Sequence, residues 1–333
     1  MALIESLKRK LLLSLVFGLV VILALVIYAD LPKIGQALGG FKWQYLPAIL
    51  GLTLLNYALR FVKWHLYLRL IGIPPIGPRD SFLIFFSGLS MSMTPGKVGE
   101  WLKSYLLKER TGTPIAASAP IVMAERLTDG LALLLLALGG LLIYGYGWEV
   151  LLVVLVGNML VVVISQHRPL AMRILSFGER LPLVARRINH LHAFYESSYQ
   201  LLRLKNLLWA VAIGFVSWSG ECVAFYYVLV GLGQEQSPML LIQAAFVLAA
   251  SSLVGAVSML PGGLAAAEGS ITGLLLLLGV TAEPSTAAAA TLLIRFCTLW
   301  FGVAVGTVAL TVFSNRLKEA VAIRQATAPP RAP

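Results

Sequence analysis

The chain has 333 residues, of which 59% are hydrophobic and only 12% are charged. A soluble domain has about 45–50% apolar and about 25% charged residues, so this composition excludes an ordinary soluble globular protein. Because the chain contains several apolar runs of about 18 or more residues, we predict an all-α, polytopic integral membrane protein. The net charge of +11 would suit a nucleic-acid-binding protein. The basic residues lie between the apolar runs, however, so we expect no nucleic-acid partner.

About six apolar runs are long enough to cross a bilayer, which takes roughly 20 residues. They cover residues 11–29, 45–66, 117–144, 149–165, 207–231 and 286–313. The first run follows Lys8, Arg9 and Lys10, as in a signal peptide, but Ile27 and Ala29 make a poor cleavage site. We therefore predict an uncleaved first span.

Further apolar runs come in pairs around a Pro-Gly break. The pairs are 81–93 with 98–107 and 239–260 with 264–279. A proline removes a backbone donor and a glycine admits angles that a helix forbids, so each helix should stop at its break. We predict two re-entrant helical hairpins, over residues 81–108 and 239–279.

The expected hinge residues of these hairpins are prolines and glycines. They are Pro95, Gly96 and Gly99 in the first hairpin, and Pro261, Gly262 and Gly263 in the second. In hydrocarbon, a broken helix is tolerated only where protein or a wet cavity supplies partners for its backbone. A matching pair of broken apolar segments therefore indicates the binding site of a transporter.

Each break is followed by a glutamate and then by an arginine within an apolar run. Glu100 precedes Arg126 by 26 positions, and Glu268 precedes Arg295 by 27. An ionisable side chain near the bilayer centre costs about 2.5–3.5 kcal/mol on insertion scales, so such residues usually face a cavity or a partner. We predict that Glu100 pairs with Arg126 and that Glu268 pairs with Arg295.

These pairs have two interpretations. They either fix each hairpin to its neighbouring span, or they bind the anionic headgroup of a lipid. Arginine suits phosphate because its planar fork donates two parallel hydrogen bonds. The helix that starts after each break would add free N–H groups and a positive dipole end. The carboxylates would repel a phosphate unless they are paired or protonated, and the sequence leaves this question open.

Other polar residues extend the predicted substrate-binding set. Lys97 lies in the first break, and Glu125 and Asp129 share one face of a helix beside Arg126. Glu221 and Asn158 are further candidates within apolar runs. The cysteines and histidines have no metal-ligand spacing, so we expect no metal and no cofactor.

The segment 166–206 is basic, and its apolar residues recur at helical spacing, so we predict an amphipathic cytoplasmic linker. It either lies on anionic headgroups or packs against the bundle. With the amino terminus and the tail 314–333 inside, nearly all basic residues fall on the cytoplasmic side. The two hairpins then enter from opposite sides. We therefore predict one membrane domain, 1–333, whose halves 45–165 and 207–313 have inverted topology.

Three motifs, in this order, resemble the lysylphosphatidylglycerol synthase transmembrane family, the flippase-like domain of bacterial multiple peptide resistance factors and their stand-alone relatives. They are Pro95-Gly96-Lys97-Val98-Gly99-Glu100, Glu125-Arg126-Leu127-Thr128-Asp129-Gly130 and Pro261-Gly262-Gly263 followed by Glu268. The resemblance covers residues 10–315 and implies a membrane domain that moves a lipid between leaflets. The sequence differs from the family pattern at 264–267, where a further glycine is often found. The chain has no room for the soluble aminoacylating domain, so we expect no lysyl transfer.

The leading hypothesis is a lipid flippase or transporter in the bacterial cytoplasmic (inner) membrane. Its substrate would be a phospholipid, glycolipid or polyprenyl-phosphate lipid with an anionic or glycosylated headgroup. The main alternative is a non-transporting accessory subunit of lipid or envelope biosynthesis. A lipid-modifying membrane enzyme is the weakest reading, because the sequence has no nucleophile–base set and no aspartate-rich diphosphate motif, so we expect no enzymatic activity. Whether the chain forms a homodimer is left open.

Overall fold

The computed structural model of the chain describes residues 16–21, 23, 24, 27, 29–94, 100–145, 147–179 and 188–326. Every regular element in these residues is a helix, and they contain no strand. Six helical segments are long and apolar enough to cross a membrane. They are Trp43–Leu70, Ile115–Tyr144, Trp148–Gln166, Leu204–Gly231, Pro238–Val257 and Pro284–Arg316. The predicted all-α, polytopic membrane protein is confirmed.

The observed spans differ from the predicted ones at one place in the chain. The predicted first span, 11–29, is described only in part, and its described residues are mostly helical. Helix α12 (Pro238–Val257), which the sequence predicts as a limb of the second hairpin, is 20 residues long and is itself a candidate span. A helix that stops at a break can thus be as long as one that crosses, and length alone does not separate the two.

The other helices follow in chain order. They are α2 (Leu31–Gly39), α3 (Leu46–Leu70), α4 (Pro78–Leu89), α5 (Leu102–Thr111), α6 (Ile115–Tyr144), α7 (Trp148–Gln166), α8 (Arg168–Glu179), α10 (Ile188–Leu201), α11 (Leu204–Gly231), α13 (Ala266–Leu277), α14 (Pro284–Arg295) and α15 (Phe301–Ala326). Prolines begin α4, α12 and α14, where the missing N–H has no helical partner to lose. Gly112 and Gly145 end α5 and α6 with φ angles of 77° and 68°, which glycine adopts without strain.

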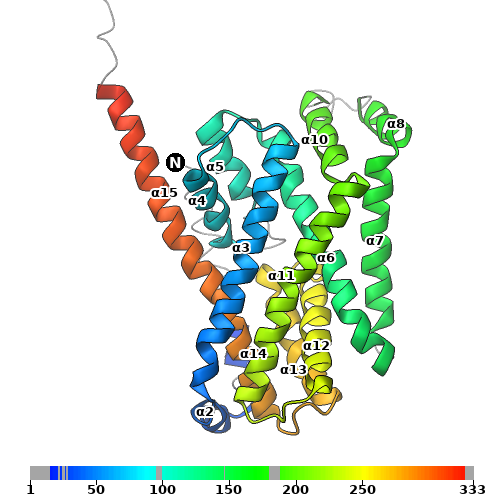
Figure 1. Ribbon diagram of the computed structural model, residues 1–333, viewed down its shortest axis with the longest axis vertical. Coiled ribbons are helices and arrows are strands. Elements are labelled where there is room, and N and C mark those ends of the chain that lie inside the picture. The colour runs from blue at the N-terminus through cyan, green and yellow to red at the C-terminus, as the bar shows by residue number, and fades with distance from the viewer. Residues whose placement is uncertain are drawn as a thin grey trace, which may run out of the picture.

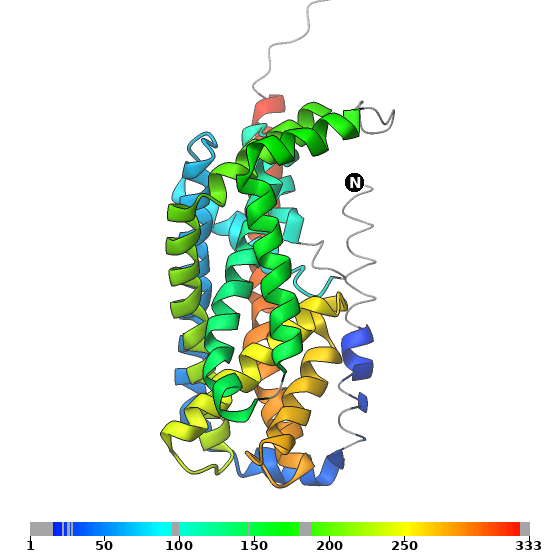
Figure 2. The same cartoon turned by 90° about the vertical axis from the view of Figure 1, so that its right-hand side faces the viewer.

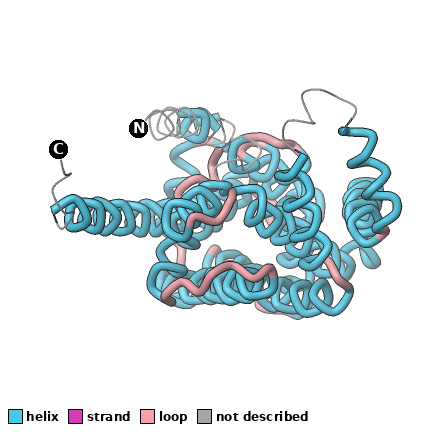
Figure 3. Tube along the Cα trace, turned by 90° about the horizontal axis from the view of Figure 1, so that it is seen from above, coloured by secondary structure: helices cyan, strands magenta, loops and turns pink. Residues whose placement is uncertain are grey.

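The helices beside each break, α4 with α5 and α12 with α13, are called the short-helix pairs, of which α12, with 20 residues, is the longest member. Figure 1 shows α4 and α5 at one end, α12 and α13 at the other, and α3 and α11 running between them. Helix α4 packs along α15, and α12 packs along α6, so each short pair contacts a long helix from the other half of the chain. Seen from above, α15 extends away from the rest of the bundle (Figure 3).

Helices α3 and α11 are joined at their centre by a reciprocal pair of hydrogen bonds. The Asn56 side-chain amide donates to the Ser217 carbonyl at 3.1 Å, and the Ser217 hydroxyl donates to the Asn56 carbonyl at 3.1 Å. Both side chains are fully buried. Since buried polar groups are costly when unpaired, this crossing fixes the register of the two helices.

The ends of the two short-helix pairs meet in the middle of the molecule. A Cβ atom built on Gly262 would lie 3.4 Å from the Cα of Met93, so the backbone at the second break touches the chain just before the first. A Cβ on Gly18 would lie 3.0 Å from Met93 and 3.3 Å from Leu264 and from Trp300. The described residues of this amino-terminal segment therefore pass close to both chain segments, and Figure 2 shows them beside α13.

The break between α12 and α13 occurs where the sequence predicts it. Helix α12 ends at Val257, a single turn covers Pro261–Gly263, and α13 begins at Ala266. Gly262 and Gly263 have φ angles of 61° and 67°, and so does Ala265, at 67°. Ala265 lies in the stretch that lacks the family's further glycine, and a non-glycine residue with this φ is strained. The first hinge residues, Pro95, Gly96 and Gly99, and the candidate Lys97 lie outside the described residues.

Two helices form the described part of the basic linker. Arg168 on α8 donates two hydrogen bonds to Glu196 on α10, at 3.0 and 2.9 Å. Helix α10 packs against α6 and buries Tyr195 and Leu201. Of the two interpretations of the linker, packing against the bundle therefore holds for α10.

Candidate functional site

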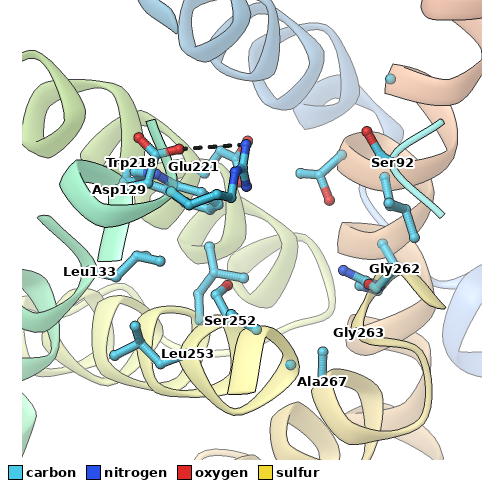
Figure 4. Close-up of a pocket in the computed structure, with 18 of the residues that line it drawn as sticks. Ser92, Asp129, Leu133, Trp218, Glu221, Ser252, Leu253, Gly262, Gly263 and Ala267 are labelled. Carbon is cyan, nitrogen blue, oxygen red and sulfur yellow. Dashed lines mark hydrogen bonds and ion pairs between the residues drawn. The ribbon is translucent and has the colours of Figure 1, made fainter. Parts of the chain in front are cut away.

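A partly open cavity of about 190 Å³, lined by both charged and apolar residues, lies where the chain on either side of the first break comes close to the second break. Its walls come from α3, α6, α11 and α12, from Pro261–Gly263, and from the end of α14. Figure 4 shows Asp129, Glu221 and Trp218 on one side and Ser92, Gly262 and Gly263 on the opposite side. The charged lining residues are Arg60, Glu100, Arg126, Asp129, Glu221 and Arg295.

The first predicted ion pair is present. Arg126 Nη2 lies 2.9 Å from Glu100 Oε2, and both residues line the cavity. Glu100 is buried, whereas 27% of the Arg126 side chain is exposed. The buried Arg126 Nε makes no hydrogen bond to any described residue. The predicted partnership is confirmed, and the arginine keeps a donor that can bind another oxygen.

The second predicted pair is also present, and its arginine makes a further hydrogen bond to the backbone. Arg295 Nε donates to Glu268 Oε1 at 2.6 Å, and Arg295 Nη2 donates to the carbonyl of Gly262 at 2.9 Å. The arginine thereby provides a partner for a backbone carbonyl that the broken helix leaves without one. Arg295 lines the cavity, while Glu268 lies behind it, on the side of the amino-terminal helix.

Asp129 is the centre of a larger ionic cluster on the opposite wall. Its carboxylate accepts a hydrogen bond from Lys63 at 2.5 Å, lies 3.6 Å from Arg60 and lies 4.0 Å from Arg126. Lys63 is fully buried. The predicted candidate Asp129 therefore reaches the cavity, with the basic partners Arg60 and Lys63 from α3. Neither partner is among the predicted binding residues.

Glu125 lies elsewhere. It is 1% exposed, forms an ion pair with Lys103 of α5 and does not line the cavity. The Lys103 ammonium also lies 4.9 Å from the ring centre of Trp64 and 5.2 Å from that of Phe85. Lys103 is buried to 3% exposure, so a basic residue between two apolar runs need not lie at the membrane surface. The Glu125–Lys103 pair fixes α5 to α6.

The cavity contains polar residues that sequence reasoning missed or ranked low. Tyr57 and Trp218 line it, and so does Glu221, a weaker candidate. The Trp218 Nε1–H is buried and donates to none of the described residues. Asn158, the other weak candidate, lies outside the cavity and donates to the Val154 carbonyl of its own helix. Aromatic residues in apolar runs carry no sequence signal that separates cavity walls from lipid contacts.

A π-helical turn, Phe296–Trp300, follows Arg295 directly. Such turns are rare and leave backbone groups without their usual helical partners. Here the Tyr57 hydroxyl donates to the Thr298 carbonyl at 2.5 Å, from the opposite wall of the cavity. The turn sets the direction of Arg295 and Thr298 toward the cavity, and no sequence pattern predicts it.

Among the residues that the structure describes, the buried charges of this region balance. The basic residues are Arg60, Lys63, Lys103, Arg126 and Arg295, and the acidic ones are Glu100, Glu125, Asp129, Glu221 and Glu268. The two sets are equal in number. The carboxylates near both breaks have an arginine within 3 Å, so the repulsion that they would exert on a phosphate is largely compensated.

Comparison with known proteins identifies relatives but no structural template. No solved structure matches this chain. Three proteins of Methanothermobacter thermautotrophicus, each called a UPF0104 membrane protein, are similar to it. One is 27% identical over 94% of this chain and 98% of its own length, and another is 26% identical over 95% and 97%. The third is 24% identical over 83% of this chain and 86% of its own length.

A family model covers most of the cavity-forming part of the chain. The model described as the lysylphosphatidylglycerol synthase TM region matches residues 12–306, which include both breaks and both arginines. The predicted resemblance is confirmed. The chain belongs to the family of the lysylphosphatidylglycerol synthase TM region.

Proposed function

We propose that this protein moves a membrane lipid with an anionic or glycosylated headgroup between the two leaflets of a prokaryotic cytoplasmic membrane. One observation supports the proposal most: the chain on both sides of the first break, together with the second break, lines a cavity that holds arginines and carboxylates inside an apolar bundle. Ionisable groups of this kind inside a membrane domain are costly and usually functional. The family's description as a lysylphosphatidylglycerol synthase TM region agrees with a lipid substrate.

The arrangement of the halves supports transport. Each short-helix pair packs on a long helix of the other half, and α3 and α11 exchange equivalent hydrogen bonds at their crossing. We interpret this as an inverted repeat with two re-entrant hairpins. In transporters with such repeats, rocking of one half against the other exposes a central site to alternate sides.

The chemistry of the cavity supports recognition of a headgroup. Arg126 retains a buried donor, Arg295 is held in place by Glu268 and Gly262, and Trp218 adds an indole N–H. Planar guanidinium groups suit phosphate oxygens, and carboxylates such as Asp129 and Glu221 suit the hydroxyls of a sugar. We assign no covalent chemistry to these residues and propose binding and release alone.

A non-transporting role as an accessory membrane subunit is the second candidate. It is favoured by the closed ion pairs, because Arg295 also bonds the Gly262 carbonyl and thereby stabilises the break itself. In that case both arginines would matter for folding and assembly alone.

Leaflet exchange of labelled lipids in proteoliposomes separates these functions. We expect exchange of phosphatidylglycerol or a glycolipid by the wild type. Replacing the headgroup donor by Arg126→Ala should reduce the rate by about tenfold to a hundredfold, since hydrogen bonds to charged groups contribute about 1.5–3 kcal/mol. The matched control is Arg168→Ala, which removes an exposed arginine that pairs with Glu196 far from the cavity.

The control should exchange lipid at the wild-type rate. Background exchange by a folded wild-type protein, across phospholipids and glycolipids, would contradict transport and favour the accessory role. If Arg126→Ala lowers the amount of folded protein by the same factor as it lowers lipid exchange, the accessory role would also be favoured.

A further inference from the structure

We propose that an apolar crevice beside Arg295, between the amino-terminal helix and the second hairpin, binds the hydrocarbon chain of the transported lipid. This inference rests on the proposed function, because it assigns a place to the tail of the lipid whose headgroup occupies the central cavity. The crevice consists of two adjoining spaces of about 350 Å³ each, and Val21 and Glu268 line both.

The crevice joins the central cavity at one residue. Arg295 lines both the cavity and the first of the two spaces, and its guanidinium group donates to Glu268 on the crevice side and to Gly262 on the cavity side. A lipid with its phosphate near Arg295 would therefore leave its glycerol and chains directly at the mouth of the crevice. This is the expected geometry for a headgroup in a polar chamber and a tail in hydrocarbon.

The walls of the crevice suit a hydrocarbon chain. Apart from the ion pair, the first space is lined by apolar residues, namely Val21, Leu38, Leu264, Leu292, Phe296 and Trp300 among others. Most polar groups that line either space already have partners: Glu268 Oε1 accepts from Arg295, and the Thr272 hydroxyl bonds with that of Thr291, whereas Glu268 Oε2 accepts from none of the described residues. A polar ligand would find few free donors or acceptors here, whereas a chain gains apolar contacts.

Glycines leave room along the hairpin. Gly269 lines the second space, and so does Gly273, and a Cβ atom built on either would contact nothing within 4 Å. At Gly18 the packing is tighter, because a Cβ atom there would lie 3.0 Å from the Met93 side chain and 3.3 Å from that of Leu264. The amino-terminal helix thus packs closely at this point, while the space beside α13 stays open.

The test uses these glycines as places to fill the crevice. Gly269→Leu and Gly273→Leu add a side chain to open space, and the matched control is Gly157→Leu on α7, where a Cβ also meets nothing within 4 Å. Each variant in proteoliposomes is irradiated with a phosphatidylglycerol carrying a diazirine near the end of one acyl chain. Adducts are then mapped by mass spectrometry, and leaflet exchange is measured in parallel.

We expect wild-type adducts on residues 264–276 and 292–300, reduced about tenfold in Gly269→Leu and Gly273→Leu but unchanged in Gly157→Leu. Adducts confined to other lipid-facing surfaces, or equal adducts in all variants, would overturn the crevice assignment. The labelling does not depend on transport. Labelling of the crevice without exchange by the wild type would contradict the proposed function alone, and exchange without labelling would contradict this inference alone.

Discussion

The two halves of the molecule share an arginine–glutamate pair at each break but differ in how the helix after each break is attached to the next helix. In the first half, Lys103 of α5 forms a buried ion pair with Glu125 of α6. At the corresponding spacing from Glu268 and Arg295, the second half has Ile271 and Ile294. Both isoleucines are buried in one apolar cluster. A charged contact in one half thus stands where an apolar contact stands in the other.

Helices α3 and α11 show the same contrast. Counting from the reciprocal bonds of Asn56 and Ser217, Arg60 corresponds to Glu221, and Lys63 corresponds to Ala224. The first half therefore supplies the cations that surround Asp129. The position that corresponds to Asp129, by its spacing from Arg126, is Thr298, which also lines the cavity.

This contrast separates the contacts that both halves share from those that differ between them. The arginine–glutamate pairs occur in both halves. The attachments of α5 and α13 to the helices that follow them differ, so either an ion pair or an apolar contact suffices there. Buried ion pairs are often no more stabilising than well-packed apolar residues of similar volume.

The largest effect on stability is expected for a variant that breaks the ion pair between α5 and α6 in the first half. Lys103→Met leaves the Glu125 carboxylate buried without its cation, and we expect the free energy of unfolding to fall by about 3–5 kcal/mol. The double variant Lys103→Ile, Glu125→Ile copies the second half and should be neutral or more stable by about 1–4 kcal/mol. Thermal unfolding in detergent micelles measures both. A single variant as stable as the wild type would contradict the role of the pair.

A smaller effect is expected at the joint between the halves. Asn56→Ala removes the amide donor to Ser217 and leaves a buried carbonyl with less hydrogen bonding, so we expect a loss of about 1–3 kcal/mol in unfolding free energy. Asn158→Ala is the control, since that side chain bonds its own helix and is partly exposed. The control should change stability by about 0.5 kcal/mol or less. Equal losses in the two variants would show that the crossing has no special contribution.

The smallest effect concerns the second break and has the opposite sign. Ala265→Gly relieves a φ of 67° that costs a non-glycine residue about 1–2 kcal/mol. Since glycine also gains entropy in the unfolded chain, we expect a net stabilisation of about 0.5–1 kcal/mol. Ala267→Gly, two residues on and inside α13, should instead destabilise by about 1 kcal/mol. Calorimetry of both variants measures these two changes in stability. A loss of stability in Ala265→Gly would contradict backbone strain at Ala265.

Much of the fold and part of the site could be predicted from sequence for a physical reason. Long apolar runs and Pro-Gly breaks are local features, and Arg126 and Arg295 lie so deep in apolar runs that they need partners. Lys63 and Lys103 could not be placed in this way, because a basic residue near the end of an apolar run looks the same whether it reaches the surface or a buried carboxylate. Their depth depends on tertiary packing.

The same limit applies to the cavity walls. Asp129 was predicted from its charge and its position beside Arg126, but the contributions of Tyr57 and Trp218 follow from the crossing of α3 and α11.

The π-helical turn Phe296–Trp300 also has a consequence for helix register. It adds one residue to the turn, and each added residue rotates everything that follows by about 100° around the helix axis. After that rotation, Gly302 faces Tyr57 and Gly306 faces α4. A Cβ atom at Gly302 would lie 2.6 Å from the Tyr57 hydroxyl, and one at Gly306 would lie 2.2 Å from the backbone nitrogen of Ser90. The two glycines and the inserted residue therefore depend on one another. Deleting a residue from this turn would rotate Gly302 and Gly306 away from Tyr57 and α4, and bulkier side chains of α15 would then face α4.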